Sequence, residues 1–279
     1  MNKRALIVGI NNYRDINRLR GCVNDTTNLR IALEEFAGFD VDQVRLLLDE
    51  EATKAAIEGE LRWLVRDAAP GDLLVLHFSG HGSQVRDRDD RDELRDQLDE
   101  ILCPWDMGWD GTFINDDYLD TVLQVPEGVV LEVILDCCNS GGSGSELDVP
   151  GSSLAPASDA EPDRLPRFVQ PPLDVASRHA GASLPQRRLL ERREPNRLAM
   201  WSACADSQTA ADARIDGIPN GAFTFYFCKH LREAEGAITR AALLEQVKMS
   251  LSQAGYSQVP ELAAPPEFLH EHPFTRRAV

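Results

Sequence analysis

Apolar and polar positions along this chain alternate in runs that predict a regular succession of strands and helices. Five short apolar runs, bounded by polar or turn residues, are typical of buried strands. They lie at residues 5–10, 44–48, 72–78, 129–135 and 198–203. Segments with helical spacing of apolar residues lie at about 25–37, 53–68, 117–125, 221–235 and 239–254. Asn24, Thr53 and Thr239 stand where helix N-caps are expected.

This alternation predicts an α/β fold with a mostly parallel sheet. Strands that are apolar on both faces require helices on both sides of the sheet. Ligands of such sheets bind beyond the carboxyl ends of the strands. Functional residues are therefore expected at those ends.

One region, 143–197, shows neither a helical nor a strand period. It holds eight of the 16 prolines and eight arginines. We interpret it as a long exposed linker. The expected organisation is thus a larger block at 1–142, a linker at 143–197 and a smaller block at 198–279.

Composition narrows the range of partners and compartments. The chain has 279 residues and a formal net charge of −17, which argues against nucleic acid or anionic membrane as the main partner. This charge suits metal ions or Lys- and Arg-bearing peptides, and the alternative is that it serves only solubility. The apolar run at 5–10 is too short for a signal peptide or membrane span. We therefore expect a cytoplasmic protein whose six cysteines are reduced.

Two strand ends carry the candidate chemistry. LHFSGHG (76–82) delivers His81 at a glycine turn, and ILDCCNSGG (134–142) delivers Cys138. An imidazole that takes a thiol proton, and a thiolate that attacks a carbonyl carbon, are what a cysteine hydrolase needs. Because strand side chains alternate, Asp136 should share a face with Cys138, and Ser79 with His81.

With these motifs the chain resembles a type I metacaspase, a cysteine protease of the caspase fold. SGHG at 79–82 and DCCNSG at 136–141 match the histidine and nucleophile motifs, although Asn139 stands where the family usually has His. Further similar blocks, in the family's order, are GCVND (21–25), SACADSQTAAD (202–212), GAFTFYFCKHL (221–231) and QVPEL (258–262). The resemblance implies a caspase-like three-layer sandwich, with six or more strands in a mostly parallel central sheet, a p20-like region at 1–142 and a p10-like region at 198–279.

The resemblance also implies a catalytic dyad and a basic specificity. His81 and Cys138 would form the dyad, and backbone N–H groups near Gly82 and Cys138 would stabilise the oxyanion. The S1 pocket of the family corresponds here to Cys22, Asp25, Ser79 and Asp136, with Asp206 as a further candidate at its border. Carboxylates suit Arg or Lys before the scissile bond. Asp25 could alternatively be a simple helix N-terminal charge.

A calcium site is the one cofactor that the resemblance implies. Its ligands correspond to Asp99, Asp116 and Asp117, with Glu146 or Asp148 as a fourth, and no organic cofactor is expected. The alternative is a solvated acidic loop in which Asp116 or Asp117 caps a helix.

The arginine-rich linker suggests self-cleavage. It is tethered near a pocket expected to bind arginine, so its local concentration is high. We expect it to be cut by the enzyme itself or by an upstream protease, and to occupy the cleft before that. Arg188 and Arg193 are the favoured sites, with Arg164, Arg167 and Arg178 left open. The alternative is a spacer without a regulatory part.

Three other readings of the same residues compete with a protease. The first is a catalytically silent caspase-fold adaptor, although such proteins usually lose the Cys or the His. The second is a metal-binding module built from His77, His81, Cys137 and Cys138, although adjacent strand cysteines face opposite ways. The third is a cysteine hydrolase of non-peptide amides or esters, whose nucleophile would more often sit in a G-x-C-x-G turn. By resemblance we expect a monomer that acts on peptides or proteins.

Overall fold

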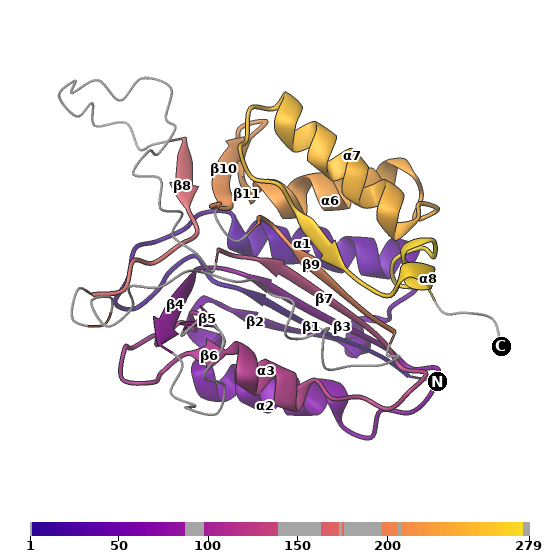
Figure 1. The fold of residues 1–279 in the computed structure, drawn as a ribbon, viewed down its shortest axis with the longest axis horizontal. Helices are drawn as coiled ribbons and strands as arrows, with labels where there is room; N and C mark the ends of the chain where they lie inside the picture. The colour runs from indigo at the N-terminus through magenta and orange to yellow at the C-terminus, as the bar shows by residue number, and fades with distance from the viewer. Residues whose placement is uncertain are drawn as a thin grey trace.

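The computed structural model describes residues 2–86, 98–138, 163–172, 175, 197–205 and 208–275. Its centre is a six-stranded sheet in the order β12-β9-β7-β3-β1-β2 (Figure 1). Five strands run parallel and β12 pairs antiparallel with β9 at one edge. The strands are β1 (Lys3–Gly9), β2 (Val44–Leu48), β3 (Leu73–Ser79), β7 (Val130–Asp136), β9 (Arg197–Ser202) and β12 (Glu261–Ala263). The sequence predicted the five parallel strands within one or two residues at each end.

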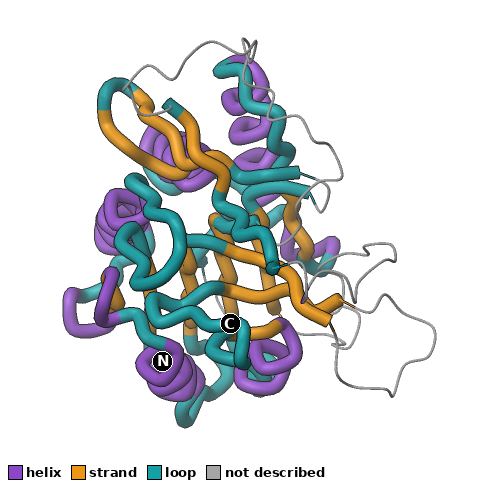
Figure 2. Tube along the Cα trace, turned by 90° about the vertical axis from the view of Figure 1, so that its left-hand side faces the viewer, coloured by secondary structure: helices purple, strands orange, loops and turns teal. Residues whose placement is uncertain are grey.

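Helices cover both faces of this sheet, as the continuous apolar strands require. On one face lie α1 (Cys22–Phe36), α6 (Ala222–Glu233) and α7 (Arg240–Gln253), and on the other lie α2 (Lys54–Val65) and α3 (Asp116–Val122) (Figures 1 and 2). The short helix α8 (Pro266–Leu269) adjoins α7. Two turns of 3-10 helix, Val41–Gln43 and Asp49–Glu51, flank β2. The expected three-layer α/β sandwich is confirmed.

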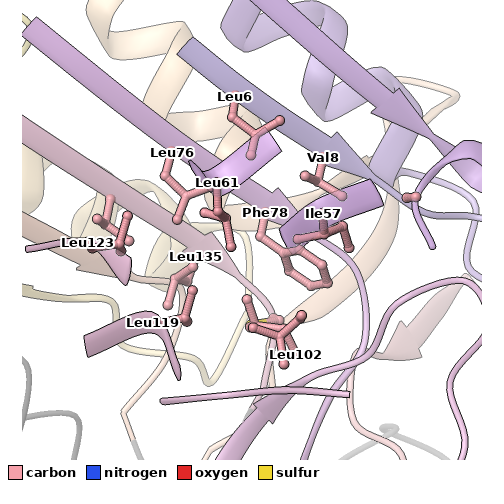
Figure 3. Close-up of a cluster of buried hydrophobic side chains, with 14 of the residues drawn as sticks. Leu6, Val8, Ile57, Leu61, Leu76, Phe78, Leu102, Leu119, Leu123 and Leu135 are labelled. Atoms are coloured by element: carbon pink, nitrogen blue, oxygen red, sulfur yellow. The ribbon is translucent and has the colours of Figure 1, made fainter. Parts of the chain in front are cut away.

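Two apolar clusters, one on each face, hold the layers together. In the cluster of Figure 3, strand residues such as Leu76 and Phe78 face Leu61 of α2 and Leu119 of α3. The opposite cluster joins the sheet to α1, α6 and α7, for example through Trp201 and Phe227. Burial of each such side chain contributes about 1.5–3 kcal/mol. The sheet is therefore fixed from both sides, and its strand ends are held at fixed positions.

The helix caps follow the sequence in two of three cases. Thr53 accepts a hydrogen bond from the N–H of Ala56, and Thr239 accepts one from Ala242. The predicted cap at Asn24 is wrong: α1 begins at Cys22, and its N-cap, Gly21, makes no side-chain hydrogen bond. The side chain of Asn24 instead donates to the carbonyl of Pro219, 2.7 Å away.

Two small sheets lie beyond the carboxyl ends of the central strands. One consists of β4 (Gly82–Arg86), β5 (Leu98–Leu102) and β6 (Ile114–Asn115). The other consists of β8 (Arg164–Pro166), β10 (Ala211–Ile215) and β11 (Ile218–Gly221) (Figure 1). Residues 163–172 correct the expectation of an exposed linker only in part, because Arg164 is exposed whereas Arg167 is not. Residues of β8 pair with β10, and Arg167 is completely buried. The segment has no regular alternation of apolar and polar residues, so pairing with a distant strand, and not its local sequence, makes it a strand.

The boundaries at 142 and 197 remain a prediction, although β9, which opens the smaller block, pairs directly with β7 of the larger block. No helix in the described ranges is long and apolar enough to span a membrane.

Candidate active site

The two predicted motifs meet because their strands are neighbours. β3 and β7 pair in parallel with Ser79 opposite Asp136, so both strands end at the same level. His81 follows the first strand and Cys138 follows the second within two residues. Parallel pairing thus brings a histidine and a cysteine, far apart in sequence, to one edge of the sheet.

Cys138 is buried on the α6 side of the sheet. Cys137 belongs to the opposite apolar cluster, as strand alternation predicts. The sulfur of Cys138 accepts from the N–H of Ala210 and lies 3.7 Å from the carbonyl oxygen of that residue. The Sγ of Cys204, a residue that the sequence did not single out, lies 3.8 Å from the Sγ of Cys138.

His81 is oriented by three contacts. Its backbone N–H donates to the hydroxyl of Tyr13, and the two rings pack with centroids 5.0 Å apart. Nε2 lies 2.8 Å from the carbonyl oxygen of Asn17, which can only accept, so Nε2 carries the hydrogen. Nδ1 is buried, and the ring also interacts with the backbone of Arg167. Burial lowers the pKa of His81 to about 4, so the ring is neutral and Nδ1 presents a lone pair.

The backbone of Arg167, from the region expected to be a linker, lies between the two motifs. Its carbonyl oxygen accepts from the N–H of Gly82 at 3.0 Å and from the N–H of Cys138 at 3.4 Å. Its own N–H donates to the carbonyl of Ala210 at 3.1 Å, and the N–H of Val169 donates to that of Gly82 at 3.0 Å. The main chain around Arg167 is therefore held on both sides of its carbonyl group.

The guanidinium group of Arg167 is enclosed by the predicted S1 residues. Nη1 donates to the hydroxyl of Ser79 at 2.7 Å and lies 3.1 Å from a carboxylate oxygen of Asp136. Nη2 donates to Asp25 at 2.8 Å and lies 3.5 Å from Asp212. Of these four contact residues, sequence reasoning missed only Asp212. That residue ends the SACADSQTAAD block, and its carboxylate accepts from the backbone N–H groups of Arg20 and Gly21.

The charges in this pocket depend on one another. Burial raises the pKa of Asp25 to about 7, against the lowering effects of Arg167 and of the hydrogen bond from Ser79. Burial also opposes the charge of Arg167, but the neighbouring carboxylates outweigh it and raise the pKa of Arg167 well above its usual range. Three buried carboxylates around one site require a cation between them.

Two further residues shape the pocket. Cys22 is buried at the start of α1 and hydrogen-bonds with Ser79, while burial raises the pKa of its thiol well above the usual range. A Cβ at Gly221 would stand 2.3 Å from Asp136, 2.6 Å from Asp25 and 2.6 Å from Arg167. Only glycine leaves room at position 221 for both carboxylates and the guanidinium, and its N–H donates to Asp25 at 2.8 Å.

The predicted calcium ligands are only partly described. Asp116 and Asp117 lie in the first turn of α3, whose N-cap is neither of them but Asn115. Asp99 lies in β5, and its side chain is outside the described part of the structure, as are Glu146 and Asp148. Among the residues that the structure describes, no group of three or more His, Cys, Asp and Glu side chains could hold a metal.

Five further residues named from the sequence lie outside the described ranges. They are Asn139, Arg178, Arg188, Arg193 and Asp206.

The fold and the site together define a class of protein. A mostly parallel six-stranded sheet with helices on both faces, and a cysteine and a histidine motif on adjacent strand ends, is the arrangement of caspase-like cysteine peptidases. The solved structure of protein GSU0716 from Geobacter sulfurreducens has the same fold, with a TM-score of 0.65 over 99% of both chains at 22% identity.

Sequence comparison then identifies the family. The model of the family described as "Metacaspase, peptidase C14 domain" matches residues 3–150. Metacaspase-1B of Neosartorya fischeri is 31% identical over 94% of this chain and 68% of the relative, and Metacaspase-1A of Aspergillus niger is 31% identical over 94% and 70%. The chain belongs to the metacaspase family and is a cysteine-type peptidase of the caspase clan, whose substrates are peptides or proteins.

Proposed function

We propose that this peptidase cleaves peptide bonds after Arg or Lys, with Cys138 as the nucleophile and His81 as the general acid and base. One observation carries the proposal: the chain's own Arg167 lies among Asp25, Asp136 and Asp212 while its carbonyl group lies between the two motifs. The contacts to the Arg167 backbone are those that a bound substrate would make.

The proposed mechanism is acyl transfer. The neutral His81 takes the thiol proton of Cys138 at Nδ1, while the Asn17 carbonyl holds Nε2–H and so fixes the ring. The thiolate attacks the carbonyl carbon of the residue in the pocket. The negative charge that develops on its oxygen is stabilised by the N–H groups of Gly82 and Cys138, typically by about 3 kcal/mol for each donor. The imidazolium then protonates the leaving amine, and water hydrolyses the thioester.

The arrangement of polar groups in the pocket supports a preference for arginine over lysine. The planar guanidinium spans Ser79 and Asp136 with one nitrogen and reaches Asp25 with the other. A lysine ammonium carries the same charge but lacks the two separate nitrogens with which the guanidinium group reaches these residues. An aspartate would be repelled by three buried carboxylates.

A fluorogenic peptide panel tests this function. Peptides that differ only in Arg, Lys, Asp or Ala before the reporter group are incubated with the wild type and with Cys138→Ala. We expect cleavage after Arg and, more slowly, after Lys, and no turnover by the variant. Preferential cleavage after Asp would refute the pocket assignment, and turnover by Cys138→Ala would refute the nucleophile.

We further propose that the first substrate is the chain itself, cut between Arg167 and Phe168. The sequence favoured Arg188 and Arg193, but Arg167 is the linker arginine whose contacts in the described ranges match those of a substrate. Until it is cut, Arg167 keeps other peptides out of the pocket. Cleavage would release the carbonyl and the guanidinium together.

Intact-mass analysis of the purified protein over time distinguishes these sites. We expect the wild type to give a fragment that ends at Arg167, and the Arg188→Ala/Arg193→Ala double variant to give the same fragment. Arg167→Ala should not produce that fragment and should hydrolyse added peptides without a delay. An unchanged wild-type mass, or cuts only at Arg188 or Arg193, would contradict this site.

We also propose that calcium binds between Asp99, Asp116 and Asp117 and stabilises the acidic part of the chain to which they belong. Ile101 of β5 pairs with Asn115, and α3 begins at the next residue, so β5, which contains Asp99, lies beside the start of α3. Asp116 and Asp117 supply the hard oxygen ligands that calcium prefers. When bound, the ion would neutralise these crowded carboxylates.

Calorimetric titration of calcium into chelator-treated Cys138→Ala protein tests the proposed ion. Heat of binding should be lost in the same protein carrying Asp116→Asn and Asp117→Asn. Full peptide hydrolysis by the wild type in excess chelator, or equal binding by both proteins, would remove calcium from this site.

A further inference from the structure

A second arginine of the same segment occupies a site of its own. Arg164 lies three residues before Arg167, at the start of β8, where it pairs with Ala213 of β10. Its Nη1 donates to the carbonyl of Gly255 at 2.8 Å, and its Nη2 donates to that of Ala254 at 3.2 Å. Its guanidinium carbon lies 4.2 Å from the centre of the Tyr256 ring.

The end of α7 creates this arrangement. The helix stops at Gln253, Gly255 adopts a left-handed φ of +74°, and the N–H of Tyr256 turns back to the carbonyl of Leu251. Such a turn directs the Ala254 and Gly255 carbonyls away from the helix. A helix C-terminus also carries partial negative charge, so carbonyl oxygens and an aromatic face together attract a cation.

We propose that Tyr256 and the carbonyls of Ala254 and Gly255 form a second cation-binding subsite, which selects arginine at the fourth position before the scissile bond. The inference rests on the proposed function, because this position is counted from a cut after Arg167. The preferred substrates would then be peptides with two arginines separated by two residues, as in Arg-Leu-Pro-Arg at 164–167.

The geometry favours arginine over lysine at this position. Two guanidinium nitrogens reach two carbonyls while the flat group lies over the Tyr256 ring. An ammonium group could approach the ring or one carbonyl but has no plane to stack. Because the Arg164 side chain is exposed to solvent, the gain is moderate, about fivefold in kcat/KM.

Competition between peptides in one tube measures this gain directly. Wild-type enzyme is given equal amounts of Arg-Leu-Pro-Arg, Lys-Leu-Pro-Arg and Ala-Leu-Pro-Arg peptides with the same leaving group, and their products are separated by mass. Because all three compete for the same enzyme, residual linker in the pocket does not change the ratios. We expect the Arg peptide to be consumed about five times faster than the Ala peptide, with Lys between them.

The outcomes separate the subsite from the proposed function. Equal rates for all three peptides would overturn the subsite while leaving cleavage after arginine intact. Cleavage of none of them would overturn both. In Tyr256→Leu the ratio of the rates for the Arg and Ala peptides should fall towards one. Tyr256→Phe keeps the aromatic ring and should retain the ratio of the wild type. A preference that persists fully in Tyr256→Leu would overturn the assignment to this ring.

Discussion

Arg167 shows how much of the site depends on single charges. Its guanidinium is fully buried and contacts Asp25, Asp136 and Asp212. Buried carboxylates without a partner are costly, and a cation between them removes most of that cost. The same carboxylates that fix Arg167 would fix the arginine of an external peptide. Under the proposed function, these contacts of Arg167 would also be the contacts of a substrate arginine.

His77 gives a prediction for the pH dependence of stability. Burial, together with the positive charge of Arg167, lowers the pKa of His77 to about 3. Between this value and the ordinary value near 6.5, the unfolded chain binds a proton that the native protein does not. The free energy of unfolding therefore falls as pH falls through this window, by about 1.4 kcal/mol per pH unit for one such residue.

Chemical denaturation of Cys138→Ala, with and without His77→Gln, measures this effect. The first protein should lose stability more steeply than the second between about pH 6 and pH 4. The Cys138→Ala background avoids self-cleavage during the measurement. Identical slopes in the two proteins would contradict a neutral buried His77.

At the scale of elements, a charged residue inside an apolar strand is held by partners from distant elements. Glu132 lies within the buried strand β7, where its carboxylate accepts from Trp201 of β9 at 3.0 Å and from Nε of Arg240 at 2.8 Å. Arg240 starts α7 and is also buried, with its guanidinium against the Phe268 ring. This ion pair ties the central strand to a helix 108 residues away in the chain.

Breaking this pair should destabilise the protein strongly. Arg240→Met leaves the carboxylate of Glu132 buried without its cation, so the free energy of unfolding should fall by about 3–5 kcal/mol. Lys248→Met, which removes the exposed pair with Glu245, should cost less than about 1 kcal/mol. Denaturant titration measures the free energy of unfolding of both variants. Equal losses would show that the buried pair of Glu132 and Arg240 stabilises the protein no more than the exposed pair.

For the whole molecule, the central sheet joins the two blocks on either side of the proposed cut. β9 pairs with β7 along its length, with Val130 opposite Arg197 and Leu135 opposite Ser202. Side chains of α6 and α7, among them Phe227 and Val247, complete the apolar cluster that covers β1 and β3. Cleavage after Arg167 would interrupt the chain but none of these contacts.

The cut protein should therefore remain one particle. After complete self-cleavage, denaturing gels should show two fragments, while native mass spectrometry should show both in a single one-to-one complex. Retention of the wild-type elution volume in size exclusion would agree with this result. Fragments that separate in native buffer would contradict a shared core.

The sequence by itself determined the layers, the order of the parallel strands along the chain and the pair of motifs. Apolar periodicity sets strands and helices locally, which is why β2 was predicted at its observed bounds and why Thr53 and Thr239 cap helices as expected. The start of α1 was missed because Asn24 has a distant partner, Pro219, that outweighs local capping.

Only the tertiary structure decided which linker arginine enters the pocket and what surrounds it. The segment around Arg167 has no period of its own and takes its conformation from β10, a strand more than 40 residues further along the chain. Asp212 and Tyr256 likewise acquire their roles from contacts with Arg167 and Arg164. Local sequence patterns determine strands and helix caps, because these depend on residues that are neighbours in the chain. The partners of a buried charge come from distant segments, which only the fold brings together.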